Sequence, residues 1–205
     1  MGRTIIEQGQ GYEIYCSDTL GSVVPYAPDK RVDGQNHGFR DLRDHPHLIK
    51  FIPEVATSEG LAAILREVNS FRSALMTLGC DCMLISPNCV SSYVAIAFRE
   101  SWRNRPQSLA TLARRLAREV LVTEPLRIRI ALSIEPLRNF FGEKDCFELI
   151  VKIFAYGATP QQASAAFEHG AWACAAALNR LKLSTRKSGG RLGRDTILDS
   201  TEQAN

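Results

Sequence analysis

The chain has 205 residues, of which 45% are hydrophobic and 23% charged, a composition typical of a globular protein and unlike that of a largely disordered one. The net charge of +3 is too small for a protein whose whole surface attracts nucleic acid. No apolar run approaches the roughly 20 residues of a membrane-spanning helix, and the N-terminus resembles neither a secretory signal nor a transit peptide, so a cytoplasmic location is expected.

Residues 1–56 predict an irregular N-terminal arm, because they show no sustained helical or strand periodicity. Two segments in it, YEIYC and SVVPY, are compatible with short strands. The stretch from Ala27 to His47 is polar and aperiodic, which indicates a long ordered loop.

A helix is predicted to begin near Thr57 and to end at Gly79, where a glycine can adopt the left-handed conformation of a helix end. Apolar residues recur along it at spacings of three and four, namely Leu61, Ile64, Leu65, Val68, Phe71, Leu75 and Leu78. The segments CDCMLI and VSSYVAIAFRE follow, and the turn signal SPN between them predicts a β-hairpin.

A second amphipathic helix is predicted from Pro106 to the region before Pro125. The next two segments, LRIRIALSIE and CFELIVKIFAY, have an apolar residue at every second position and predict a second hairpin. A last helix is predicted from Thr159, with Pro160 in its first turn and Gln162 placed to complete a capping box. The polar, glycine-containing residues 184–205 predict a flexible C-terminal tail.

These elements follow the order α-β-β-α-β-β-α within residues 57–183, and one-sided helices need a sheet face on which to bury their apolar stripes. The predicted fold class is therefore α+β, a two-layer sandwich. We expect an antiparallel sheet made of the two hairpins, three helices on one of its faces, and the arm of residues 1–56 outside this core.

The second face of the sheet is the predicted binding surface, because a mixed face with several large apolar residues needs a cover. Its expected members are Tyr93, Arg99, Arg127, Arg129, Lys152, Phe154 and Tyr156. The cover could be the N-terminal arm, a partner protein or second copy of the chain, or a nucleic acid whose bases stack on the aromatic rings. Trp172, which lies off the apolar stripe of the last helix, is a further candidate anchor for a partner.

The function favoured by these observations is that of a non-enzymatic, cytoplasmic accessory or regulatory subunit that binds another protein or associates with itself. The first alternative is a nucleic-acid-binding protein that uses the arginines of the sheet face and the basic second helix. Against it, Glu148 would lie in the path of the phosphates and the net charge is modest.

The second alternative is a Cys- or zinc-dependent enzyme. Its candidate metal ligands are Cys80, Cys82, Cys89, His45 and His47, but the paired C-x-x-C elements of common zinc sites are missing. The sequence also lacks G-x-S-x-G, H-E-x-x-H, P-loop and dinucleotide-binding motifs. We therefore assign no catalytic residue and expect neither a metal nor a cofactor.

Overall fold

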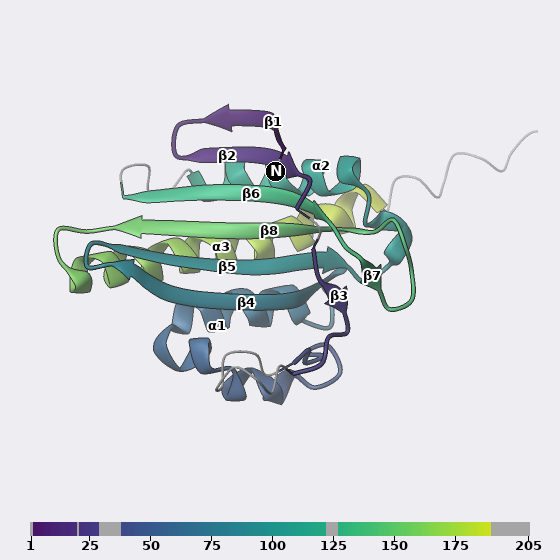
Figure 1. Ribbon diagram of the computed structural model, residues 1–205, viewed down its shortest axis with the longest axis horizontal. Coiled ribbons are helices and arrows are strands. Elements are labelled where there is room, and N and C mark those ends of the chain that lie inside the picture. Colours follow the sequence, from purple (N-terminus) through teal and green to yellow (C-terminus); the bar gives the residue numbers. More distant parts are fainter. Residues whose placement is uncertain (1, 20, 29–37, 122–126, 190–205) are drawn as a thin grey trace, which may run out of the picture.

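The protein forms a six-stranded sheet with three helices packed on one face (Figure 1). This is seen in a computed structural model that describes residues 2–19, 21–28, 38–121 and 127–189. The strands of the sheet, in chain order, are β1 (Arg3–Gly9), β2 (Tyr12–Ser17), β4 (Leu75–Ser86), β5 (Cys89–Phe98), β6 (Ile128–Pro136) and β8 (Phe147–Tyr156). Their spatial order is β1-β2-β6-β8-β5-β4. The predicted α+β class is confirmed.

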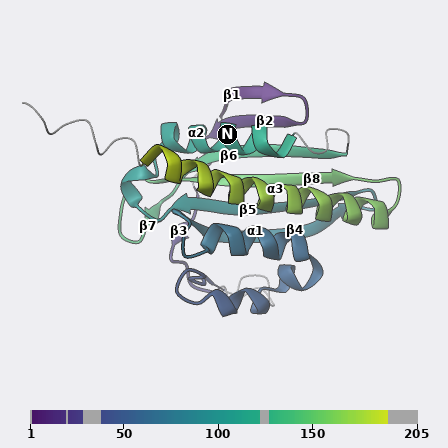
Figure 2. The same cartoon turned by 180° about the vertical axis from the view of Figure 1, so that it is seen from behind.

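The helices are α1 (Glu59–Asn69), α2 (Pro106–Leu121) and α3 (Pro160–Gly189). Figure 2, which views the face of the sheet that the helices cover, shows α3 between the other two. Three short 3-10 helices connect the elements: η1 (Pro46–Phe51), η2 (Pro53–Thr57) and η3 (Ser101–Arg103). A separate pair of parallel strands, β3 (Val23–Val24) and β7 (Asn139–Phe140), crosses one end of the other face.

The main core lies between the helices and the sheet, as the alternation in the second hairpin predicts. Ile130, Leu132 and Ile134 of β6 and Leu149 and Ile153 of β8 are almost completely buried against the helices. The alternating face of a strand and the stripe of an amphipathic helix are complementary surfaces, so both become buried when they meet.

The predicted cap of the last helix is also present. The hydroxyl of Thr159 accepts a hydrogen bond from the amide of Gln162 at 3.2 Å, and the side chain of Gln162 accepts one from the amide of Ala158 at 3.0 Å. α3 then continues to Gly189, past the expected boundary of the tail at residue 184. Residues 190–205 of that tail, and Pro125 and Leu126, lie outside the part of the chain that the structure describes.

The prediction of a purely antiparallel sheet of two hairpins is wrong, because the N-terminal arm is part of the sheet. β1 and β2 form a third hairpin, and β2 pairs with β6 in parallel, so that Glu13 lies opposite Ala131. β1 shows no alternation of buried and exposed residues, which is why periodicity does not reveal it. The parallel pairing joins segments more than 100 residues apart in the chain, and no local signal indicates such a neighbour.

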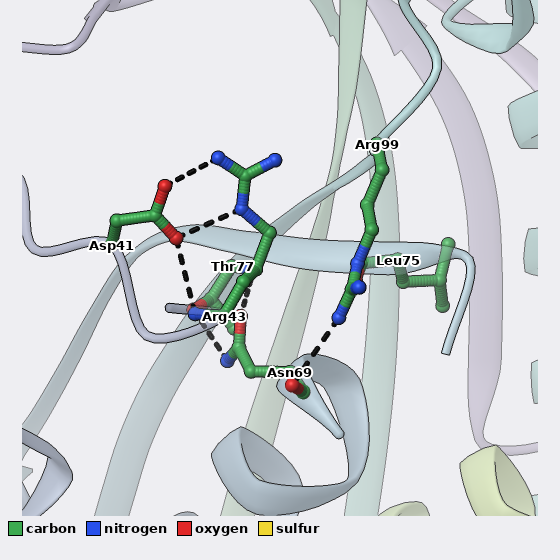
Figure 3. A network of polar contacts seen from close by, with 6 residues as sticks. All are labelled: Asp41, Arg43, Asn69, Leu75, Thr77 and Arg99. Carbon is green, nitrogen blue, oxygen red and sulfur yellow. Dashed lines mark hydrogen bonds and ion pairs between the residues drawn. The ribbon is translucent and has the colours of Figure 1, made fainter. Parts of the chain in front are cut away.

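The first predicted helix is also too long, since α1 ends at Asn69 and Leu75 and Leu78 belong to β4. The side-chain amide of Asn69 donates hydrogen bonds to the carbonyl of Leu65 and the hydroxyl of Thr77, both at 2.8 Å. Its oxygen accepts a hydrogen bond from the Thr77 amide, and Figure 3 shows how Asn69 and Thr77 lie. These bonds turn the chain from helix to strand. The helical spacing beyond Asn69 is a coincidence, because Phe71, a member of the expected stripe, is 97% exposed.

Of the helices in the described part of the chain, none has both the length and the hydrophobicity that a membrane-spanning segment requires.

Candidate functional site

The sheet face opposite the helices is built from rows of side chains that strand register places next to one another. One row runs Met83, Ser91, Phe154, Arg129 across β4, β5, β8 and β6. The next row along the strands runs Asp81, Tyr93, Lys152, Ala131, Glu13, and reaches β2. Since alternate residues of a strand share a face, these rows bring the predicted residues Tyr93, Arg129, Lys152 and Phe154 together.

One end of this face is covered, by the arm and by the loop between β6 and β8. Val24 and Phe140, from the parallel strands β3 and β7, pack with Leu137 on Met76 and Ala97 of the sheet to form a second, smaller core. Part of residues 1–56 therefore does fold over the sheet, which is one of the three covers considered from the sequence.

A cavity of about 620 Å³ lies beside this cover. Its floor is formed by sheet residues, among them Gly79, Ala95 and Ile150, and the small side chains on the floor leave space above the sheet. The cavity continues around the edge of the sheet at β4, where a register shift between Thr77 and Gly79 interrupts the regular pairing. The arm contributes Tyr26 and the segment around Arg40 to its wall.

Two glutamates in the cavity lie directly opposite each other on neighbouring strands, Glu135 on β6 and Glu148 on β8. They are 8% and 3% exposed. The hydroxyl of Ser133 donates a hydrogen bond to Glu135 at 2.6 Å, and the backbone amide of Ser22 donates one to Glu148. Burial, and then the like charge of Glu135, raise the pKa of Glu148 to about 7. This carboxyl group therefore holds or releases a proton near neutral pH.

The phenol and thiol groups that line the same cavity are neutral at pH 7. Burial raises the pKa of Tyr93 to about 12 and that of the Cys80 thiol to about 12. Burial also raises the pKa of Tyr26. The cavity is therefore a partly apolar space with acidic and phenolic groups, and pockets of this kind are the usual location of ligand sites.

The opposite end of the sheet face, next to the turn between β4 and β5, is exposed. Tyr93 and Tyr156 are exposed and Phe154 is half-buried there. The amide of Tyr156 donates a hydrogen bond to the carbonyl of Arg127 at 2.9 Å, so these two residues also lie at this end. Arg129 forms an ion pair with Glu13 at 3.0 Å.

The hairpin beside this end carries three residues that sequence reasoning did not select, Met83, Leu84 and Ile85. They are 51%, 54% and 52% exposed and lie on β4, the last strand of the sheet. The available signal was the unbroken apolar run MLI, which does not alternate as the rest of the sheet does. Met83 adjoins the sheet face that carries Tyr93, Arg129, Lys152, Phe154 and Tyr156, whereas Leu84 pairs with the core residue Val90 and points to the other face. This exposed end of the sheet, formed by these residues together with Ile85, is called the hairpin-end surface below.

Two predicted binding residues lie away from this surface. Arg99 follows β5 and points at the end of α1 (Figure 3), where its guanidinium group donates hydrogen bonds to the carbonyls of Asn69, Ser70 and Leu75. The bonds to Asn69 and Ser70 satisfy carbonyls that the end of α1 leaves free, and the bond to Leu75 connects Arg99 to β4. Trp172 is exposed on α3, on the helical side of the molecule.

The basic residues around the second helix are mostly paired. Arg114 forms an ion pair with Glu7 of β1 at 2.9 Å, and Arg103 stacks on the ring of Phe98. Arg105 donates a hydrogen bond to the carbonyl of Asp145 at 2.6 Å.

The candidate zinc ligands do not form one cluster. Cys80 and Cys82 face the main core from β4, Cys89 is buried in β5, and His45 and His47 lie together at the start of η1, with ring centroids 5.9 Å apart. Across the described ranges, no group of three or more His, Cys, Asp or Glu side chains is arranged to hold a metal ion.

Comparison of the chain with protein-family models, with curated proteins and with solved structures finds no significant match. Any functional conclusion therefore depends on the geometry alone.

Proposed function

We propose that the protein is a non-enzymatic, cytoplasmic accessory or regulatory subunit that binds another protein, or a second copy of itself, through the hairpin-end surface. The observation that carries the proposal is the run Met83, Leu84 and Ile85, each more than half exposed on an edge strand. Consecutive exposed apolar residues are avoided on a free protein surface unless they serve a function.

An edge strand supports binding to a protein in particular. Its outward backbone amides and carbonyls can pair with an added strand, and the apolar side chains of β4 would supply pockets for alternate residues of that strand. Tyr93, Phe154 and Tyr156 supply aromatic contacts on the adjoining face, and Arg129 and Lys152 supply a polar rim. Aromatic residues and arginine are enriched in protein interfaces, which agrees with this composition.

The nucleic-acid alternative is weakened by the pairing of its cations. Arg129 is bound to Glu13, and Arg114 is bound to Glu7. Asp81 lies in the same row as Tyr93 and Lys152, so a phosphate chain along this face would meet a carboxylate.

The enzyme alternative is weakened by the state of the cysteines. A nucleophilic cysteine needs a thiolate, whereas burial raises the pKa of Cys80 to about 12 and of Cys82 to about 11. All six cysteines are free thiols, which is consistent with the reducing environment of the cytoplasm.

The test is site-specific photocrosslinking in the cells that produce the protein. A benzophenone amino acid replaces Leu84 on the hairpin in one variant and Arg115, which is exposed on α2, in the control. We expect one discrete protein adduct, or a crosslinked dimer, from position 84 and not from position 115. Identical adduct patterns from both positions, or an adduct with nucleic acid, would overturn the proposal.

A further inference from the structure

The cavity contains a buried pair of carboxyl groups without a cationic partner. Glu135 and Glu148 receive hydrogen bonds from Ser133 and Ser22, but within the described part of the chain neither forms an ion pair. Elsewhere on the same sheet face the structure does pair its buried carboxylate, since Glu13 binds both Arg3 and Arg129. A buried charge without a counterion is unfavourable, so an entering cation would be stabilised at the glutamate pair.

The shape and lining of the cavity favour an organic cation over a metal ion. Divalent hard cations need about six or more oxygen ligands, and the described residues provide no group of three metal-ligating side chains. The cavity has a volume of about 620 Å³, and its wall includes the rings of Tyr26 and Tyr93 beside Ile150 and Ala95. Aromatic rings attract organic cations, and apolar side chains accept a hydrocarbon chain.

The backbone closes tightly over the glutamate pair. The amide of Gly21 donates a hydrogen bond to the carbonyl of Pro136 at 2.7 Å. A Cβ atom at residue 21 would lie 2.7 Å from both that carbonyl oxygen and a carboxylate oxygen of Glu148. The absence of a side chain at Gly21 is therefore what lets the arm lie directly against Glu148 and form one wall of the cavity.

We propose that this cavity binds a small organic ammonium ion, with its charged group at the Glu135–Glu148 pair and its carbon skeleton against the two tyrosines. Two arginines, Arg40 and Arg138, also line the cavity, and their positive charge favours a ligand with a single ammonium group over a polyamine. This proposal goes beyond partner binding, and Tyr93 is the residue of the hairpin-end surface that also lines this cavity.

Binding is coupled to the release of a proton. In the empty cavity Glu148 retains a proton to about pH 7, because of burial and of Glu135, whereas a bound ammonium ion favours the ionised carboxylate. The backbone amide of Ser22 donates a hydrogen bond to Glu148. The charged and titratable groups that line the same cavity are Tyr26, Arg40, Glu54, Cys80, Tyr93, Glu135 and Arg138. Affinity is expected to rise roughly tenfold from pH 6 to pH 8, as the carboxyl group ionises.

The experiment is isothermal titration calorimetry of the full chain with pentylamine, pentanol and pentanoate, which share one carbon chain and differ in charge. We expect pentylamine to bind at least tenfold more tightly than the other two. Measurements in two buffers of different ionisation enthalpy should detect proton release at pH 7. Glu148→Gln and Glu135→Gln should each weaken pentylamine binding at least tenfold, while Glu59→Gln, a substitution of an exposed carboxylate on α1, should not change it.

The glutamine variants keep the size of the side chain and remove only its charge, so circular dichroism can verify that they fold. Absence of pentylamine binding, equal binding of the three probes, equal binding by the glutamine variants, or binding of divalent metal ions alone would overturn the proposal.

Discussion

Replacement of Glu148 by Gln is expected to stabilise the protein at pH 8 and to leave its stability unchanged near pH 4.5. In the folded chain the pKa of Glu148 is about 7, compared with an ordinary value of 4.5. Below pH 4.5 the group is protonated in both states and contributes no difference. As the pH rises from 4.5 to 7, the unfolded chain loses this proton first, so the free energy of unfolding decreases.

Above pH 7 the cost of the buried charge is complete. The interval between 4.5 and about 7 corresponds to up to about 3.5 kcal/mol, at about 1.4 kcal/mol for each pH unit. The substituted glutamine cannot ionise, and its carbonyl oxygen can still accept the hydrogen bond from Ser22. The Glu148→Gln variant is therefore expected to be more stable than the wild type by up to about 3.5 kcal/mol at pH 8.

Urea denaturation at pH 4.5, 6, 7 and 8, followed by circular dichroism, measures the difference in the free energy of unfolding between this variant and the wild type. Glu59→Gln, which replaces an exposed carboxylate, is the control and is expected to change the free energy of unfolding by less than about 1 kcal/mol. Glu135→Gln removes the neighbouring like charge, so the pH at which Glu148 titrates should decrease. A Glu148→Gln variant that is no more stable than the wild type at pH 8, or whose advantage is the same at all four pH values, would refute the reasoning.

Three further substitutions test the packing. Asn69→Ala removes the three hydrogen bonds of this side chain, one to Leu65 within α1 and two to Thr77 of β4. It leaves Thr77 without this partner, so urea denaturation should show a loss of about 2–3 kcal/mol; a loss below that of an exposed Asn179→Ala control would contradict it. In the described ranges, the hydroxyl of Ser92 is the single buried side-chain oxygen or nitrogen without a hydrogen bond. Ser92→Ala should therefore leave stability unchanged or raise it by about 1 kcal/mol. A clear drop in melting temperature would disprove this prediction. The double substitution Leu84→Ser and Ile85→Ser should change the free energy of unfolding by less than about 1 kcal/mol, because both residues are exposed. It should also reduce the binding of a hydrophobic dye such as ANS. Unchanged dye fluorescence would show that these residues form no accessible apolar surface.

The elements that periodicity predicted well are those with one face against the main core. Every second residue of β6 and β8 is apolar and faces the main core, as Ile130 and Ile153 do, and α2 buries Leu109 and Leu116. Residues on the buried face of a helix or strand are mostly apolar and repeat with the period of that element, so the sequence pattern indicates which element is present. β1 buries neither of its faces, so it shows no periodic pattern in the sequence. The local signal for the hairpin of β1 and β2 is Gly11, which has a positive φ angle in the turn between the two strands.

The candidate sites were predictable to a smaller extent. The sequence placed Tyr93, Lys152 and Phe154 on one face because residues two apart on a strand share a face. It did not indicate that Glu135 would lie opposite Glu148, since this pairing depends on the register between β6 and β8. Nor did it indicate that Tyr26 of the arm would reach the same cavity.

From its sequence alone, this protein is an α+β chain with three one-sided helices and two alternating hairpins, because local periodicity is set by which side chains leave water. The tertiary structure decided that the arm enters the sheet, that β2 runs parallel to β6, and that a cavity with two buried glutamates lies under the arm. These features depend on contacts between segments that are distant in the sequence. The packing of the whole chain determines the geometry of such contacts, and no single segment carries a periodic pattern that predicts them.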